Sequence, residues 1–318
     1  TEPAMYGITL KLKKPMIAAC ISAGVGGFIM GLFSGLEKIG LGKLDKLEIF
    51  EEDSKKNAAK PGQPGTAATQ KHKVTEEDLL FDKSYTCPVC DNEFHSKMIR
   101  TGKVKLLSAD TDLRPKYQLV DSLKYDALVC PECGYASLSR FFKFMMPAQA
   151  KLIRENISKN FSGLPKTGST YTYDDAILRH QLALANAIVK KAKNSEKAYT
   201  CLKMAWLYRG KAETLPKETK DYDKTIKELK KEETELLSKA YDGFMTAFSR
   251  ESFPMCGMDE MTVTFLVAEL ARRTGKYEES GRWISKVLTS RNANERIKNK
   301  ARDIKELLNE DKKKAGIS

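Results

Sequence analysis

Apolar positions recur at two different spacings along this chain, and the change of spacing divides it into two parts. Residues 98–107 and 123–129 carry short or alternating apolar runs, which are typical of strands. From residue 136 onward apolar side chains recur every three or four positions, as they do on one face of a helix. The pattern predicts an α+β fold that is mostly α, with a small β module followed by a helical array.

Helices are expected over most of the second part. Residues 162–175 are rich in turn-forming residues and interrupt the helical pattern, with Asp174 or Asp175 as the expected N-cap of the next helix. The expected helices are 136–146, 148–161, 175–193, 195–212, 218–249, 258–274, 277–290 and 294–310.

The amino-terminal part differs in composition from both the β module and the helical array. Residues 15–36 carry no charge and are long enough to cross a bilayer, so a membrane anchor is one interpretation. Residues 54–75 hold mostly Lys, Pro, Gly, Ala and Thr, as flexible linkers do. We expect four parts: an apolar segment at 1–36, an amphipathic start with a linker at 37–78, a zinc-ribbon-like domain at 79–140 and a helical domain at 141–318.

The net charge of +13 is unevenly spread. Residues 87–140 hold eight basic and seven acidic side chains, whereas residues 141–215 hold thirteen and five. A β module that bound the phosphate backbone of a nucleic acid would itself be basic. The charge pattern therefore leaves nucleic-acid binding as an alternative that rests on the basic helices around Lys190, Lys191 and Lys193.

Two Cys-x-x-Cys pairs, separated by 39 residues, carry the clearest chemistry. Each pair has Pro after its first cysteine, and two intervening residues let a tight turn aim both sulfurs at one point. Two such turns supply four thiolates, which is the tetrahedral set that Zn²⁺ prefers in structural sites. The predicted zinc ligands are Cys87, Cys90, Cys130 and Cys133.

Other interpretations of these cysteines have less support. A redox dithiol needs a βαβ context and leaves the second pair unexplained. Seven cysteines in 318 residues are few for a disulfide framework, and they favour a cytoplasmic protein. His95 lies close enough to the first pair to replace one ligand, but with four cysteines at hand we expect a surface histidine.

The segment between the pairs contains Asp110, Asp112 and Arg114. Two carboxylates beside an arginine are compatible with an acid–base pair or with a second metal site. We expect instead a loop held by Asp–Arg pairing, because no nucleophile, histidine or glycine-rich phosphate loop accompanies the two acids. No catalytic residue is predicted, and we expect a protein that is not an enzyme.

The cysteine pairs, this loop and the following helices together resemble one bacterial family, known as domain of unknown function twenty-two twenty-five. The resemblance covers about residues 30–318 and implies a zinc ribbon on a helical scaffold, without implying an activity. The residues that carry it are Cys87, Cys90, Asp112, Arg114, Tyr117, Cys130, Cys133, Gly134 and Tyr135.

Residues 264–288 resemble a tetratricopeptide repeat, which is a pair of packed helices. Ala268 lies on the first helix, and Gly275 and Tyr277 lie at the turn. Ser280 stands where the repeat usually has alanine. The resemblance implies a helical array that binds a protein or peptide partner.

Residues 1–29 resemble a piece of the membrane-embedded sugar-transporting subunit of bacterial phosphotransferase systems, the β-glucoside class. Residues 1–7 (TEPAMYG) and 13–15 (KKP) carry the match, which covers less than a tenth of the chain. We interpret it as a fused permease fragment, with Met30 opening the working protein; a genuine membrane anchor is the alternative.

The sequence thus predicts a cytoplasmic, non-enzymatic zinc protein that acts as a protein-interaction scaffold. Nucleic-acid binding is the alternative, and a permease fragment at the amino terminus is a third function. Membrane association is expected only through residues 15–36.

Overall fold

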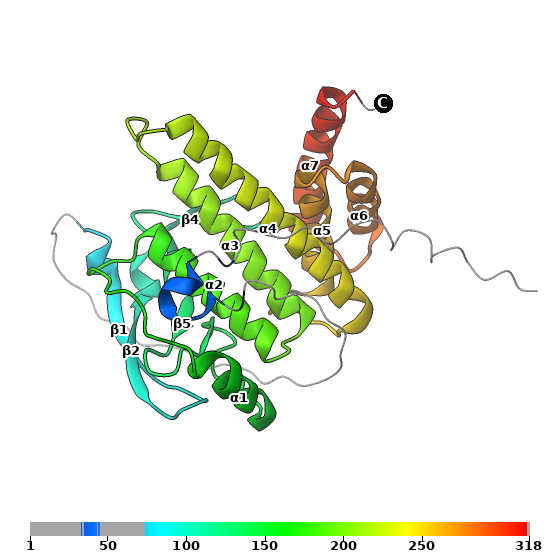
Figure 1. Ribbon diagram of the computed structural model, residues 1–318. Helices are drawn as coiled ribbons and strands as arrows, with labels where there is room; N and C mark the ends of the chain where they lie inside the picture. The colour runs from blue at the N-terminus through cyan, green and yellow to red at the C-terminus, as the bar shows by residue number, and fades with distance from the viewer. Residues whose placement is uncertain (1–32, 34, 43, 45–73, 317–318) are drawn as a thin grey trace, which may run out of the picture.

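The computed structural model describes residues 33, 35–42, 44 and 74–316 (Figure 1). Residues 15–32 of the apolar segment, the permease-like residues 1–29 and the linker at 54–73 lie outside this part of the chain. Among the described residues, no helix combines the length and the apolar character that crossing a membrane requires.

In the described part of the chain, six short strands form three antiparallel hairpins, each made of two consecutive strands. The first Cys-x-x-Cys pair forms the turn of the first hairpin, and the second pair forms the turn of the third. Because each pair closes a hairpin, the sheet pairing fixes the direction in which its sulfurs point. The strands are β1 (Leu80–Thr86), β2 (Glu93–Ile99), β3 (Leu106–Ala109), β4 (Pro115–Tyr117), β5 (Ala127–Val129) and β6 (Ala136–Leu138).

The helix expected at 136–146 is wrong, because none of these residues is helical. Residues 136–138 form β6, which pairs with β5, and turns follow before the first α-helix begins at Pro147. All three residues of β6 are buried, so both faces of this short strand are covered. A short apolar run that is buried on both faces carries no period of two, which is why its pattern resembles that of a buried helix.

The strand expected at 98–107 is also divided. β2 ends at Ile99, a 3₁₀ turn spans Thr101–Lys103, and β3 begins at Leu106. Glycine at position 102 favours the turn and interrupts the strand.

The helices from residue 173 onward agree with the expected ranges to within a few residues. α2 begins with a capping box: Asp175 N donates to Thr172 Oγ1 at 3.1 Å, and Thr172 N donates to Asp175 Oδ2 at 2.9 Å. The N-cap is therefore Thr172, not Asp174 or Asp175. The helices are α1 (Pro147–Ile153), which continues into a π turn (Arg154–Ser158), α2 (Tyr173–Val189), α3 (Asn194–Thr214), α4 (Tyr222–Arg250), α5 (Glu260–Arg273), α6 (Tyr277–Thr289) and α7 (Glu295–Lys314).

One hydrophobic core joins the β module to the helices. Leu128 of β5 and Leu138 of β6 lie in the same buried cluster as Leu182 of α2 and Phe244 of α4. A second cluster, which includes Ile304, is built among α5, α6 and α7. β5 and β6 therefore lie beside α2 at one end of the molecule, and α5–α7 form the other end (Figure 1).

A short piece of the amino-terminal region also belongs to the main core. The 3₁₀ helix Leu36–Ile39 buries Leu36 and Ile39 completely or nearly so, and Leu41 follows them. These apolar side chains pack in the main core, and their burial removes apolar surface from water. The sequence pattern had assigned them to the segments at 1–36 and 37–78, outside the helical domain.

Candidate metal centre

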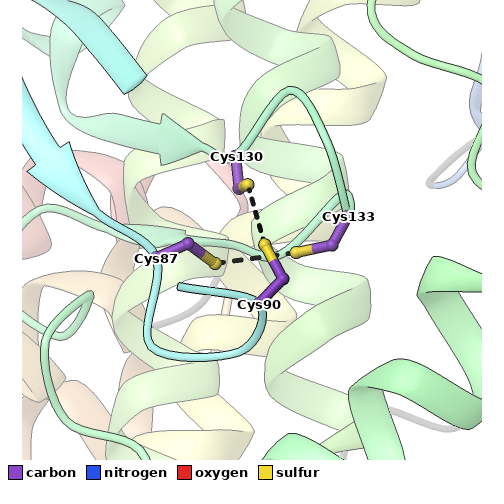
Figure 2. Close-up of side chains that lie close together, drawn as sticks. All are labelled: Cys87, Cys90, Cys130 and Cys133. Atoms are coloured by element: carbon purple, nitrogen blue, oxygen red, sulfur yellow. Dashed lines mark hydrogen bonds between the residues drawn. The ribbon is translucent and has the colours of Figure 1, made fainter. Parts of the chain in front are cut away.

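The four predicted cysteines converge on one point (Figure 2). Their Sγ atoms all lie within 4.8 Å of one another, with 3.6 Å between Cys87 and Cys133 and 3.7 Å between Cys90 and Cys130. A tetrahedral ion with bonds of about 2.3 Å to sulfur separates its ligands by about 3.8 Å. A disulfide would bring two sulfurs to about 2.05 Å, and all four cysteines are free. The spacing is that of a metal site.

The two cysteine turns have the same backbone structure. Cys87 N donates to Asn92 O at 2.9 Å, and Cys130 N donates to Tyr135 O at 2.8 Å. At the fifth position of each turn the backbone is left-handed, with φ of 58° at Asp91 and 70° at Gly134. Two equivalent turns facing each other bring four sulfurs together from two sequence-distant hairpins.

Gly134 is required for more than its positive φ. A Cβ at this position would lie 2.5 Å from Phe161 Cγ, closer than van der Waals contact allows. The Gly134 carbonyl accepts a hydrogen bond from Asn186 Nδ2 of α2 at 3.1 Å. The second cysteine turn is therefore held to α2 by this hydrogen bond, and it approaches Phe161 more closely than any residue except glycine permits.

A further polar contact holds the first turn. Arg154, in the π turn after α1, donates from Nε and Nη2 to Val89 O at 2.9 and 2.5 Å. Val89 itself is fully buried. Both turns are thus fixed from the helical side, so the ligand geometry depends on the helices as well as on the hairpins.

Electrostatics favours a cation among the sulfurs. Hydrogen bonding to Cys130 raises the pKa of the Cys87 and Cys133 thiols, and burial raises both further. Hydrogen bonds from Cys133 and Cys87 lower the pKa of Cys130. A divalent cation stabilises the thiolate form, in which cysteine binds a metal.

The site is closed. Cys87 and Cys130 have no exposed surface, Cys133 is 6% exposed, and Cys90 is partly exposed. Four protein sulfurs complete a tetrahedron, so no coordination position is left for water or substrate. Among the described residues these four cysteines are the group of His, Cys, Asp and Glu side chains that could hold an ion.

The remaining metal-binding candidates lie elsewhere. His95 is exposed on β2 and is not part of the cysteine group, as expected for a surface histidine. Cys201 and Cys256 are both buried and free, away from the four ligands.

The Asp110–Arg114 loop is held by ion pairs, as the sequence analysis expected. Asp112 has no exposed surface and accepts hydrogen bonds from Arg209 Nη2 at 2.6 Å and Trp206 Nε1 at 3.0 Å. Burial by itself raises the pKa of Asp112, but the hydrogen bonds and charge of Arg209 outweigh burial and lower the pKa below 3.8. The Asp112 carboxylate is therefore ionised, and both of its oxygens accept hydrogen bonds from Arg209.

The same loop reaches two more helices. Arg114 lies 3.0 Å from Glu213 at the end of α3, and Arg273 of α5 lies 3.7 Å from Asp112. Arg273 also pairs with the fully buried Glu269 at 2.7 Å. The β module is thus tied to the helical array by charged groups that the apolar pattern does not mark.

Sequence reasoning missed Arg209, Trp206 and Glu269, which come from helices roughly a hundred or more residues after the loop. One signal was available: Arg209 is a single charge following the apolar run Trp206–Tyr208. A charge at a buried helix position needs a partner, although the sequence does not say which.

Known proteins match this chain in two separate parts. The family described as "Uncharacterized protein conserved in bacteria (DUF2225)" matches residues 80–308, which is more than half of the chain. A stretch of 33 residues is 67% identical to the PTS system beta-glucoside-specific EIIBCA component of Halalkalibacterium halodurans. That stretch covers 10% of this chain and 5% of the curated relative. Both resemblances expected from the sequence are confirmed. No solved structure matches the chain.

Proposed function

The chain belongs to the DUF2225 family of bacterial proteins, and from that premise we propose that it is a non-enzymatic zinc protein that acts as a protein-interaction scaffold. The observation that carries the proposal is the group of four converging cysteine sulfurs, three of which belong to buried residues. In this proposal the metal stabilises the β module, and the helical array offers a surface to a protein or peptide.

Zinc is the ion that best fits the donor set. Four thiolates at tetrahedral spacing select soft or borderline ions, which are zinc or the iron of an iron–sulfur site. A single zinc ion needs sulfurs about 3.8 Å apart, which agrees with the distances of 3.6 and 3.7 Å between facing cysteines. Cys87, Cys90, Cys130 and Cys133 would hold it.

A structural role for the metal follows from the same geometry. A catalytic zinc keeps a position open for water, and four cysteines leave none. The two loop carboxylates are also engaged, since Asp110 lies 2.9 Å from Arg209 Nη1 and Asp112 is paired on both oxygens. These observations support a protein without an active site at the β module.

The helical array carries a partly exposed aromatic surface between α4 and α6. Phe248 lies 5.4 Å from Trp283 between ring centroids, and Lys286 lies over both rings. Aromatic residues are enriched in protein interfaces and provide much of their binding energy. α5 and α6, joined by a turn at Gly275 with φ of 77°, form the hairpin that resembles a tetratricopeptide repeat.

The nucleic-acid alternative has weaker support. Lys190 is buried and lies 2.7 Å from Glu196, so its charge is already neutralised inside the protein. Lys191 and Lys193 are exposed and remain as candidate phosphate contacts. Two lysines give only a small electrostatic contribution to nucleic-acid binding.

A cytoplasmic location is part of the proposal. Four thiols lie close together without a disulfide, which is the state that a reducing compartment maintains. The third hypothesis, a permease fragment, concerns residues outside the described part of the chain.

The test combines metal analysis with quantitative recovery of partners. The full-length protein should contain one zinc per chain, and a bacterial extract should yield partners that are depleted when Phe248 and Trp283 are both changed to alanine. Phe144→Ala, which removes a different exposed aromatic ring, is the matched control. Equal recovery with the double variant, or a metal other than zinc, would contradict the proposal.

A further inference from the structure

Three leucines lie mostly in solvent on the β3–β4 hairpin. Their exposed fractions are 53% for Leu106, 60% for Leu107 and 56% for Leu119. Only four other large apolar side chains among the described residues are exposed to a comparable degree, and they are spread over three other segments. The hairpin is therefore a local concentration of apolar surface that the fold does not cover.

The backbone of the hairpin brings these leucines together. Leu106 pairs with Tyr117, and Gln118 N donates to Lys105 O at 2.9 Å, which places Leu119 one residue beyond the last hydrogen bond of the hairpin. The register shifts between Leu106 and Ser108, so Leu107 is an extra, unpaired residue. Such a bulge turns a side chain away from the regular alternation.

The inner side of the hairpin is already used for packing. Tyr117 and Val104 pack on a small buried cluster that includes Leu79, Val120 and Tyr125. Near its turn, Lys116 lies 3.1 Å from Asp110 and pairs with α3 as well. The hairpin is thus held by these contacts, while Leu106, Leu107 and Leu119 remain mostly exposed.

The exposed leucines are surrounded by positive charge. Residues 100–108 contain Arg100, Lys103 and Lys105 and no acidic residue. Among the described residues, neither Lys103 nor Lys105 has an ion-pair partner, and both are exposed. The exposed surface of the hairpin therefore combines apolar side chains with uncompensated cations.

This combination discriminates between classes of partner. Lysine is depleted from the core of protein interfaces, so two unpaired lysines beside the exposed leucines fit the core of a protein interface poorly. A nucleic acid is bound through phosphates and stacked bases, for which exposed leucines have no function. The headgroup region of an anionic bilayer accepts both, because leucines enter the acyl boundary while lysines remain at the phosphates.

We propose that the β3–β4 hairpin docks the protein reversibly on a membrane surface that carries anionic lipid. Leu106, Leu107 and Leu119 enter the interface, and Lys103 and Lys105 contact the lipid phosphates. A few leucines and lysines give weak binding that other contacts or a partner can strengthen. This surface is separate from the aromatic surface of α4 and α6, so the two can be tested independently.

The experiment is sedimentation of the full-length protein with vesicles of phosphatidylcholine alone or mixed with phosphatidylglycerol. We expect binding to the mixed vesicles that weakens as salt rises. Changing both Leu106 and Leu107 to glutamate should lower the partition coefficient about tenfold or more. Changing both Lys103 and Lys105 to glutamate should lower it about fivefold or more for each cation removed.

The matched control is the pair Phe144→Glu and Met146→Glu, which charges another exposed apolar site and should leave binding unchanged. Residues 15–36 are present in every variant, so their contribution to binding cancels in the comparison. Circular dichroism and metal content verify that each variant is folded.

Three results would overturn the proposal. The first is wild-type binding that does not depend on phosphatidylglycerol. The second is binding that the hairpin variants leave unchanged. The third is a dimer, detected by sedimentation velocity, that the leucine variant dissociates while vesicle binding persists; this result would make the hairpin a contact between two copies of the chain.

Discussion

The indole Nε1 of Trp206 on α3 donates a hydrogen bond to Oδ2 of Asp112, a carboxylate 94 residues earlier in the chain, across 3.0 Å. The contact joins the loop between the two cysteine turns to the helical array. Asp112 has no exposed surface, so its charge depends entirely on this hydrogen bond and on the arginines beside it. The β module is therefore attached to the helices by a buried polar contact as well as by the shared core.

Asp112→Asn is expected to lower the free energy of unfolding by about 3 kcal/mol, because it leaves the buried Arg209 charge without its main partner. Chemical denaturation of the two proteins measures the difference. Asp242→Asn is the control, since Asp242 is about half exposed and pairs with Lys276 at the surface. The control should cost less than about 1 kcal/mol. Equal losses in the two variants would show that Asp112 has no special role.

Stability should fall in mild acid because of His180. Burial lowers the pKa of His180 from 6.5 to about 4, and its Nδ1 donates to Ala176 O at 2.8 Å. In the unfolded chain His180 binds a proton below about pH 6.5, whereas in the folded protein it binds one only below about pH 4. From pH 7 to pH 5 this difference removes about 2 kcal/mol from the free energy of unfolding.

The measurement is urea denaturation of wild type and of His180→Gln at both pH values. Loss of metal at low pH affects both proteins alike, so the difference between their pH dependences isolates the histidine. An identical pH dependence in the two proteins would contradict this account of His180.

Cys130→Ser is expected to abolish metal binding, because one of four ligands is lost from a site whose geometry demands all four. Metal binding in small modules of this kind contributes on the order of 10 kcal/mol or more to folding, so β5, β6 and the facing side of α2 should lose protection from hydrogen exchange. α5–α7 have a cluster of their own and should keep theirs. Elemental analysis and hydrogen-exchange mass spectrometry give the two readouts.

Cys256→Ala is the matched control for that experiment, since Cys256 is buried but is not a ligand. It should retain a full metal content. A Cys130→Ser protein with wild-type metal content would exclude the four-cysteine site.

Gly134→Ala is expected to destabilise the protein by about 2 to 3 kcal/mol, since a left-handed backbone costs about 1 kcal/mol for alanine and the added Cβ collides with Phe161. Gly163→Ala separates the two effects: its φ is 94°, but no atom lies within 4 Å of the added Cβ. The control should lose only the backbone contribution of about 1 kcal/mol. Thermal denaturation compares the two, and equal losses would mean that the contact with Phe161 is unimportant.

The sequence by itself determined the four cysteines of the candidate metal centre. Two residues between the cysteines of each pair fix how the sulfurs point, and this geometry is local to each turn. The sequence also determined the helices from residue 173 to the carboxyl end, because long segments with a helical period have few other ways to bury their apolar side chains.

The tertiary structure alone decided which groups meet across the chain. β6 is a strand because β5 lies beside it, and a run of three buried residues has no period of its own to reveal this. Arg209 and Trp206 are partners of Asp112 because α3 packs against the Asp110–Arg114 loop. Spacing along the chain specifies contacts within a helix or a turn, whereas a buried charge finds its partner only when the packing of separate elements brings the two together.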